Sequence, residues 1–287
     1  MQLVRTASEL SEAILMRKGP VFFVPTMGYL HEGHLSLLRM AARDCEEYEP
    51  RGTVVMSLFV NPTQFNDPKD LATYPRDEER DVRLAESAGC DVVFAPSVEE
   101  IYPEGLHGTT VHVPEVTERW EGEFRPGHFV GVATVVAKLF NLVIPDFAYF
   151  GEKDWQQCRV IAKMVHDLRM PVNLKFGKTV RESDGLAMSS RNALLPPEAR
   201  SRAPVLYTTL CACAEDYSRG MPPREAEQRA RERLLQSKFS KVDYIAIVDE
   251  ESLEPVESSN HPKARVLGAA HIGGVRLIDN VSVDEKD

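Results

Sequence analysis

The sequence predicts an α/β protein in which an open parallel sheet, with helices on both faces, is followed by a smaller α+β domain. Short apolar strand candidates alternate with helical segments through the first part of the chain, which is typical of a parallel sheet. Near Gly177 the pattern changes to a charge-rich helical run and then to three short strand candidates. We therefore expect two domains, residues 1–177 and residues 178–287.

The strand candidates of the first domain are short, apolar and rich in β-branched or aromatic residues. They lie at residues 21–25, 53–60, 91–95 and 146–150. Helical patterning covers residues 35–44, 77–89, 128–143 and a segment that ends near residue 168. In a sheet of this kind, ligands bind in the crevice beyond the carboxyl ends of the strands. Polar residues just after these strands are therefore the first candidates for a binding site.

The second domain is expected to combine helices with a small sheet. Residues 199–237 are helical in pattern and charge-rich, with a Gly-Met-Pro-Pro break at residues 220–223. Proline suits the first turn of the helix that follows this break. Strand candidates lie at residues 244–248, 265–269 and 275–278, with turn residues between them.

The composition argues against nucleic acids and membranes as partners. The chain has 34 Lys and Arg against 44 Asp and Glu, and its formal net charge of −10 makes it a poor general binder of phosphate backbones. Its longest apolar-leaning stretch, residues 130–144, is too short to span a bilayer and carries Lys138. Five cysteines without a C-x-x-C pair favour thiols in a reducing cytoplasm over disulfides or a zinc site. We therefore expect a cytoplasmic protein.

The segment Pro-Thr-Met-Gly-Tyr-Leu-His-Glu-Gly-His, residues 25–34, follows the first strand candidate and opens a helix. Gly28 and Gly33 allow a ligand to approach the backbone closely, and the amino terminus of a helix attracts phosphate. His31 and His34 would donate hydrogen bonds to phosphoryl oxygens and stabilise charge that grows on a phosphate under attack. The alternatives are a pair of surface or capping histidines, or half of a metal site that no Cys/His cluster in the sequence completes.

Two further segments carry residues that suit phosphate. Lys153 lies just after the strand candidate at 146–150, where it could reach a phosphate as a mobile point charge. Asp154 would alternatively cap the next helix, and Gln157 is either a ligand contact or a solvated helix residue. Residues 188–191, Met-Ser-Ser-Arg, offer hydroxyl groups and a guanidinium to phosphate, or form a polar turn before a helix.

Amide and cationic side chains mark two more turns. Asn61 and Gln64 lie in the sequence Asn-Pro-Thr-Gln-Phe, just past the strand candidate at 53–60. Amides suit a small substrate with hydroxyl and carboxyl groups, although turn formation is the alternative. Arg125, in the sequence Arg-Pro-Gly-His-Phe, either contacts an anion or lies in an exposed turn.

These segments together resemble one family. Residues 25–34 are similar to the HxGH signature of the nucleotidylyltransferase superfamily, whose fold is Rossmann-like. The combination with FVNPTQF, YPR at 74–76, VFAPSVEEIYP, RPGHF, KLFNLVIPD, FGEKDWQQ and DGLAMSSRN resembles the pantothenate synthetase family. The resemblance runs from about residue 20 to residue 195 and resumes at KVDYIAIVD and AAHIGGVRLIDN, so it covers most of the chain.

The resemblance implies an ATP-dependent, AMP-forming ligase of pantothenate biosynthesis, on the coenzyme A pathway. Pantoate and MgATP would give pantoyl adenylate and pyrophosphate. The amine of β-alanine would then attack the adenylate and give pantothenate and AMP.

The resemblance also implies roles for residues. His34 would be the catalytic proton donor, and His31 and Lys153 are the other catalytic candidates. Gln64 and Gln157 would hold pantoate, with Gln64 also near β-alanine, and the substrate candidates from the turns are Asn61 and Arg125. Contacts to ATP are implied for Met27, Gly28, Tyr29, Leu30, His31, Glu32, Gly33, His34, Gly151, Glu152, Lys153, Asp154, Val180, Met188, Ser189, Ser190 and Arg191.

Three other properties follow from the resemblance. The family carries Mg²⁺ mainly on the nucleotide phosphates, and Asp81 is a candidate for a protein contact. Family members are homodimers through the amino-terminal domain, and the smaller domain is a lid that keeps water from the mixed anhydride. The chain departs from residues usual in the family at Tyr29, Thr63, Trp155 and Lys178, and none of these changes removes a reactive group.

Other functions fit parts of the sequence. Another nucleotidylyltransferase of the HxGH type is disfavoured because Gln64 and Gln157 suit an acyl substrate, and a synthetase acting on tRNA would need a basic surface. A nucleotide sensor without catalysis would not require His34 and Lys153 together with the residues of the 188–191 segment. A metal-binding module would use His31 and His34 and would bind zinc without a nucleotide.

Overall fold

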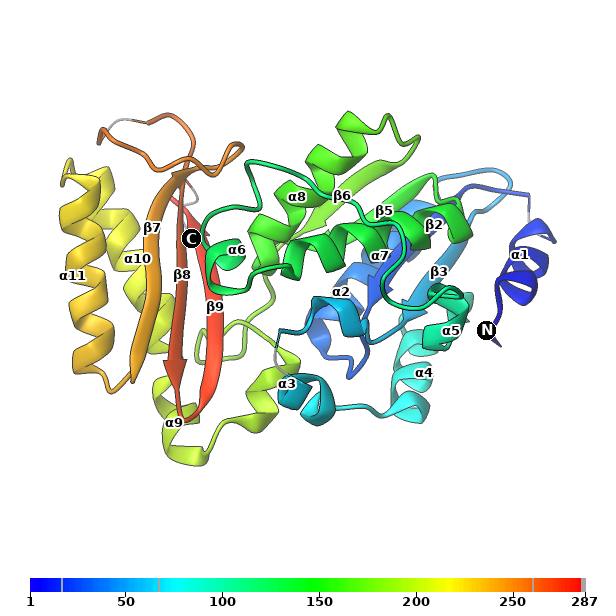
Figure 1. Ribbon diagram of the computed structural model, residues 1–287, viewed down its shortest axis with the longest axis horizontal. Helices are drawn as coiled ribbons and strands as arrows, with labels where there is room; N and C mark the ends of the chain where they lie inside the picture. Colours follow the sequence, from blue (N-terminus) through cyan, green and yellow to red (C-terminus); the bar gives the residue numbers. More distant parts are fainter. Residues whose placement is uncertain (17, 67, 260, 285–287) are drawn as a thin grey trace. The chain divides into compact units, whose positions relative to one another are not determined.

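The computed structural model describes residues 1–16, 18–66, 68–259 and 261–284, and the chain divides into two compact units (Figure 1). The first unit holds residues 1–152 and 160–178. The second holds residues 153–159 and the chain from residue 179 onward. The short segment 153–159 therefore belongs, by its contacts, with the carboxyl-terminal part of the chain.

The first unit is built on a six-stranded sheet whose described pairings are parallel. The strands are β1 (Gln2–Val4), β2 (Val21–Thr26), β3 (Thr53–Leu58), β4 (Val92–Phe94), β5 (Phe147–Gly151) and β6 (Asn173–Gly177). Their spatial order is β1-β4-β3-β2-β5-β6, so the predicted open parallel sheet is confirmed. The strands β1 and β6 are not predicted from the sequence, because both are edge strands without a buried apolar run.

Helices cover both faces of this sheet (Figure 1). The helices of this unit are α1 (Ala7–Leu15), α2 (Glu32–Cys45), α3 (Pro68–Thr73), α4 (Glu78–Ser87), α5 (Val98–Ile101), α6 (Glu121–Phe124), α7 (His128–Val143) and the later part of α8 (Trp155–Asp167). Among them, α1, α2 and α7 contact the strands, and α5 and α6 pack on α7. Phe22 of β2 packs in one buried cluster with Leu38 of α2. Phe23 points to the opposite face, because side chains alternate along a strand, and meets Phe140 of α7 edge-on.

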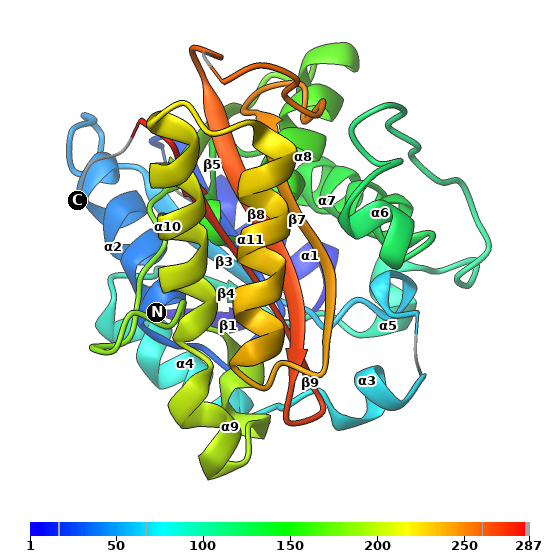
Figure 2. The same ribbon diagram turned by 90° about the vertical axis from the view of Figure 1, so that its left-hand side faces the viewer.

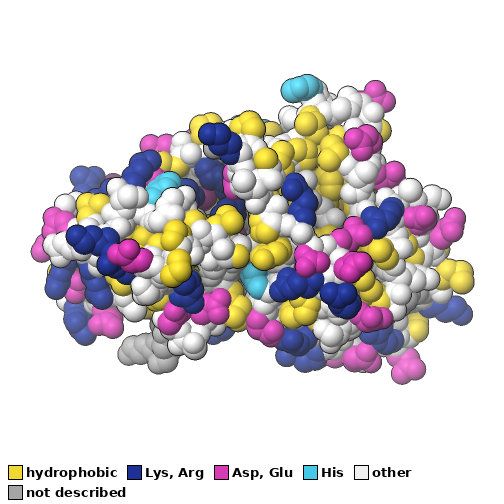
Figure 3. All heavy atoms as spheres, turned by 90° about the horizontal axis from the view of Figure 1, so that it is seen from below, with side chains coloured by type: hydrophobic (Ala, Val, Ile, Leu, Met, Phe, Trp, Pro, Cys, Tyr) yellow, Lys and Arg dark blue, Asp and Glu magenta, His cyan; other side chains and the backbone are white. Residues whose placement is uncertain are grey.

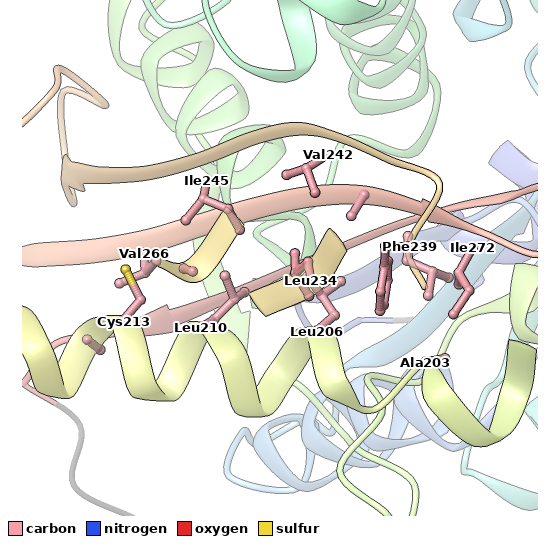
Figure 4. Close-up of a cluster of buried hydrophobic side chains, with 14 of the residues drawn as sticks. Ala203, Leu206, Leu210, Cys213, Leu234, Phe239, Val242, Ile245, Val266 and Ile272 are labelled. Carbon is pink, nitrogen blue, oxygen red and sulfur yellow. The ribbon is translucent and has the colours of Figure 1, made fainter. Parts of the chain in front are cut away.

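The second unit pairs a small antiparallel sheet with two long helices that lie side by side across one of its faces (Figure 2). Its elements are α9 (Pro197–Arg202), α10 (Val205–Ser218), α11 (Pro223–Gln236), β7 (Lys241–Asp249), β8 (Ala264–Ile272) and β9 (Val275–Ser282). Leu206 and Leu210 of α10 and Leu234 of α11 pack against Ile245 and Val266 of the sheet (Figure 4). The predicted α+β pattern is confirmed. Among the described residues, no helix combines the length and the apolar character that a membrane span requires.

Asp243 of β7 is a buried carboxylate surrounded by three basic side chains. Arg276 Nε donates to its Oδ2 at 2.7 Å, Lys241 Nζ lies 2.8 Å from its Oδ1, and His271 Nε2 lies 3.1 Å from its Oδ2. Burial raises the pKa of Asp243, but the hydrogen bonds from Lys241, Arg276 and His271 outweigh burial and hold the pKa at about 2.

We expect Asp243 to stabilise the fold near neutral pH and to lose this contribution in acid. A folded-state pKa of about 2, below the ordinary 3.8, contributes about 2 kcal/mol above pH 3.8, and this is lost as the pH falls through 2. Urea unfolding of Asp243→Asn and the parent protein at several pH values measures the difference. It should be about 2 kcal/mol near neutrality and should shrink below roughly pH 4. A difference that did not change with pH would contradict the expectation.

Candidate active site

The loop between β2 and α2 is held in an unusual backbone conformation by a buried carboxylate. Gly28 has φ +83° and Tyr29 has φ +50°, both in the left-handed region. Asp81 of α4 is 1% exposed and accepts the N–H of Tyr29 at 2.6 Å and the N–H of Leu30 at 2.7 Å. A Cβ at position 28 would meet Leu58 at 2.6 Å and Asp81 Oδ2 at 2.9 Å, so glycine is needed there. Burial raises the pKa of Asp81, and the N–H groups of Leu30 and Tyr29 offset only part of this rise.

His31 and His34 form a reciprocal cap at the amino terminus of α2. His31 Nδ1 accepts the N–H of Gly33 at 3.2 Å, and His34 Nδ1 accepts the N–H of His31 at 3.3 Å. Because each Nδ1 is an acceptor, the proton of each neutral ring is assigned to Nε2. His31 is the N-cap and His34 lies in the first turn of α2, so both rings lie at a helix end whose dipole favours an anion, and their centroids are 4.1 Å apart. The capping role is therefore present, and it sets the tautomer needed for donation to phosphate.

The turn after β3 brings Gln64 to this loop. Residues Pro62–Gln64 form a short 3-10 helix, and Gln64 Nε2 lies 2.9 Å from Met27 Sδ. Asn61 Nδ2 donates to Gln64 Oε1 at 3.1 Å and to Gly131 O at 3.2 Å. A Cβ at position 131 would lie 2.5 Å from the backbone of this turn, so a glycine in α7 permits the close approach. The side-chain amide of Gln64 is thus oriented by a contact at its oxygen, with Asn61, and by a contact at its nitrogen, with Met27.

Arg125 and His128 hold the backbone of Gln64. Arg125 Nη2 donates to Gln64 O at 3.3 Å, and His128 Nδ1 lies 2.9 Å from the same oxygen. Arg125 Nη1 also lies 3.6 Å from the carboxylate of Glu121. The contact of Arg125 with a substrate anion stays a prediction. In the structure Arg125 supports the turn that carries Gln64.

Asn61 is occupied by contacts inside the protein. It is 1% exposed, and its Oδ1 accepts the hydroxyl of Tyr102 at 2.8 Å and that of Thr63 at 3.0 Å. Its predicted contact with a substrate stays a prediction. In the structure, the side chain of Asn61 stabilises the turn that carries Gln64 through these hydrogen bonds.

In the second unit, Lys153 lies in the short 3-10 helix Glu152–Asp154, directly after β5 and its last residue Gly151. Its ammonium group lies 3.7 Å from the carboxylate of Asp154, and its side chain is 19% exposed. Its backbone carbonyl accepts Asn280 Nδ2 at 2.9 Å. Gln157 follows in the first turn of α8 and is half-buried.

Residues 180–188 form a narrow turn that leads into the Met-Ser-Ser-Arg segment. Met188 N–H donates to Val180 O at 3.0 Å and closes the turn. Ser189 Oγ accepts the N–H of Arg191 at 3.3 Å and so caps the 3-10 helix Ser190–Leu194. The polar turn named as an alternative is therefore present, and the contacts of these residues with ATP stay predictions.

The structure brings some of the predicted site residues together through partners that the sequence does not reveal. Within the first unit, Met27 and Gln64 touch, and the loop that carries Met27 also presents the two histidines. The supporting residues Asp81 and His128 lie 52 and 64 positions from the groups that they hold. No local pattern marks such long-range contacts, so sequence reasoning missed their roles.

Among the residues that the structure describes, the site offers no protein cage for a metal ion. In the parts of the chain that are described, no group of three or more His, Cys, Asp or Glu side chains is placed to hold one. Asp81, the candidate contact to Mg²⁺, uses both carboxylate oxygens to accept backbone N–H groups. Mg²⁺ is commonly bound through substrate phosphates and few protein ligands, and these residues fit only that arrangement.

Comparison with known proteins identifies relatives over the whole chain. A family model described as pantoate-beta-alanine ligase matches residues 2–282. Pantothenate synthetases from Herpetosiphon aurantiacus and Thermus thermophilus are 49% and 50% identical to the chain, over 98% and 99% of it and 99% of each relative. The crystal structure of pantothenate synthetase from Thermus thermophilus matches with a TM-score of 0.91 at 49% identity and covers 99% of both chains. A pantoate-beta-alanine ligase from Francisella tularensis, complexed with beta-gamma ATP and β-alanine, matches with a TM-score of 0.83 at 31% identity, over 100% of this chain and 99% of that one.

Proposed function

The chain belongs to the pantoate–β-alanine ligase family, and we propose that it condenses pantoate with β-alanine and ATP to give pantothenate, AMP and pyrophosphate. The Francisella relative was crystallised with an ATP compound and with β-alanine, which supports the same two substrates here. The observation that carries the proposal is the loop of residues 25–34. It presents two histidines at the positive end of a helix, and the Nδ1 of each accepts a backbone N–H, which assigns the ring proton to Nε2.

The reaction runs in two steps. A carboxylate oxygen of pantoate attacks the α-phosphorus of ATP, the bond from that phosphorus to the bridging oxygen breaks, and pyrophosphate leaves. The neutral amine of β-alanine then attacks the acyl carbon of pantoyl adenylate, AMP leaves with the electrons of the acyl C–O bond, and the nitrogen loses one proton to solvent. A carboxylate is a poor electrophile, and adenylation supplies the good leaving group that amide formation needs.

His34 is proposed to act in the first step. Its Nε2–H would donate to an α-phosphate oxygen, on which negative charge increases as the pentacoordinate transition state forms. His31 would donate beside it, and Lys153 would place a positive charge near the phosphates. The ring of His34 needs no rearrangement for this, because its Nδ1 is already fixed by the N–H of His31.

The remaining substrate contacts are proposed from the family motifs. Gln64, oriented by Asn61 and by the Arg125–His128 pair, would bind the hydroxyl and carboxyl groups of pantoate. Gln157 would share this role. ATP would be contacted by residues 27–34, 151–154, 180 and 188–191. Mg²⁺ would be carried by the phosphates of ATP and would neutralise their charge.

The surroundings of the reaction are also proposed from the family. The carboxyl-terminal domain would act as a lid, because water hydrolyses the mixed anhydride. A homodimer is proposed, with small molecules as the substrates and no nucleic acid as a partner. On the face drawn in Figure 3, acidic and basic side chains are interspersed and form no broad basic area. The cysteines include the buried thiols of Cys45, Cys90 and Cys213, which suits the reducing cytoplasm as the proposed location.

Pyrophosphate release from MgATP tests the proposal. Purified protein is given pantoate alone and then pantoate with β-alanine, and pyrophosphate, AMP and pantothenate are measured. A limited burst of pyrophosphate with pantoate, followed by steady formation of AMP and pantothenate with β-alanine, is the expected result. A folded protein that binds ATP but releases no pyrophosphate in the presence of pantoate would have a different substrate or no catalytic role.

A further inference from the structure

We infer that two adjacent residues of β9, Asp279 and Asn280, position both of the second unit's candidate ATP-binding segments. This inference rests on the proposed function. Asn280 holds the segment that carries Lys153, and Asp279 holds the turn that leads to the Met-Ser-Ser-Arg segment. Both are positioning residues, because they act through the backbone of Lys153 and through Arg181.

Asn280 holds Lys153 from one face of the sheet. Its Nδ2 donates to Lys153 O at 2.9 Å, and its Oδ1 accepts Arg265 Nη1 at 2.6 Å. The Arg265 guanidinium lies 3.8 Å from the centroid of the Trp155 ring, two residues beyond Lys153. The Trp155 indole N–H in turn donates to Glu250 O at 2.9 Å. The segment 153–159 is therefore held by three contacts: the carbonyl of Lys153 with Asn280, the ring of Trp155 with Arg265, and the indole N–H of Trp155 with the carbonyl of Glu250.

Asp279 holds the second segment from the opposite face. Arg181 donates to both of its carboxylate oxygens, with Nη1 at 2.7 Å and Nη2 at 3.1 Å. The same Arg181 Nη1 donates to Gly185 O at 3.2 Å, and the guanidinium stacks at 3.6 Å over the ring of Tyr207. Arg181 thus ties the first arm of the turn at residues 180–188, and the tip of the turn at Gly185, to β9. Met188 N–H, which closes this turn on Val180 O, is the first group of the Met-Ser-Ser-Arg segment.

The alternation of a β-strand explains how neighbours reach two different segments. Successive side chains point to opposite faces, so one dipeptide serves both faces of the sheet. Asp279 pairs in register with Gly268, whose missing side chain faces Leu210 of α10, and Asn280 pairs with Leu267. Each of the two residues is 4% exposed. Burying a carboxylate and an amide in a sheet is unfavourable unless both are hydrogen-bonded. Asp279 is paired with Arg181, at the start of the turn that leads to the Met-Ser-Ser-Arg segment, and Asn280 is bonded to Arg265 and to the carbonyl of Lys153.

A double-mutant cycle on the full-length protein tests the inference. Asn280→Asp keeps an oxygen for Arg265 but removes the N–H that holds Lys153 O. We expect the dissociation constant for MgATP to rise about tenfold and the pantoate-dependent release of pyrophosphate to slow about tenfold. In the Lys153→Met background the same substitution should change both by less than about twofold, because the group that it positions is gone. Asp279→Asn should also raise the dissociation constant for MgATP.

Asp243→Asn is the matched control. Asp243 is also buried and paired with an arginine in the same sheet, but its partners Lys241, His271 and Arg276 all lie on the strands. It should lower the unfolding free energy and leave the affinity for MgATP within about twofold of the parent. Two results would overturn the inference: the full effect of Asn280→Asp in the Lys153→Met background, or an equal loss of MgATP affinity in Asp243→Asn. Because MgATP binding is measured by calorimetry without turnover, the cycle still decides if pantoate elicits no pyrophosphate and the proposed function fails.

Discussion

Replacing His34 by alanine is expected to slow formation of the acyl adenylate by about a hundredfold to a thousandfold, which is the usual loss when one preorganised donor to a transition-state oxyanion is removed. The dissociation constant for MgATP should change by less than about tenfold, because ground-state binding is shared with the rest of the loop and with the helix dipole. Single-turnover release of pyrophosphate, measured with saturating pantoate, separates the two quantities. The physical reason is the geometry of the cap: Nδ1 of His34 accepts the N–H of His31, which leaves the proton on Nε2.

Two variants complete this test. His166→Ala removes a histidine whose side chain is 80% exposed in α8 and should leave both quantities unchanged. His34→Gln keeps an N–H donor of similar reach and should recover part of the rate. A His34→Ala protein that lost its affinity for ATP but kept its turnover at saturation would assign His34 to binding and not to the chemical step.

Replacing Asp81 by alanine is expected to have the largest combined effect on stability and activity. The carboxylate accepts two buried backbone N–H groups, from Tyr29 and Leu30, and each unsatisfied group costs about 1 to 3 kcal/mol. The unfolding free energy in urea should therefore fall by about 2 to 6 kcal/mol. Adenylation should slow by about a hundredfold, because the loop that presents His31 and His34 loses its anchor.

The control for Asp81 lies in the same helix turn. Glu79 has a side chain that is 90% exposed, and Glu79→Ala should change neither stability nor rate measurably. The dependence on Mg²⁺ distinguishes anchoring from metal binding. If Asp81 is an anchor, Asp81→Asn at saturating MgATP needs no more free Mg²⁺ for half-maximal rate than the parent does. A rate that extra Mg²⁺ restored would instead make Asp81 a ligand of the metal.

The sequence predicts the parallel α/β part and the smaller α+β part well, because the strands and helices of each part have a recognisable local pattern of apolar residues. Buried strands such as β2 and β3 are continuous apolar runs, and α7 begins and ends where the pattern predicts, at residues 128 and 143. The break at residues 220–223 does separate two helices, and Pro223 opens the second of them. The short edge strands β1 and β6 lack such a run, and only their pairing with β4 and β5 makes them strands.

By itself the sequence determined the fold class, the parallel sheet with its helices, the presence of a smaller α+β part, and the family, through motifs that are contiguous in the chain. Hydrophobic periodicity and turn residues are local properties, so they can be read without a structure. Only the tertiary structure decided which groups hold the site: Asp81 under the histidine loop, Arg125 and His128 on the backbone of Gln64, and Asn280 on Lys153. It also decided that residues 153–159 belong with the second unit. The physical reason is that each of these contacts joins residues far apart in the chain. Every residue except proline has a backbone N–H, and every residue has a carbonyl, so the sequence does not show which of these groups a distant side chain will bind.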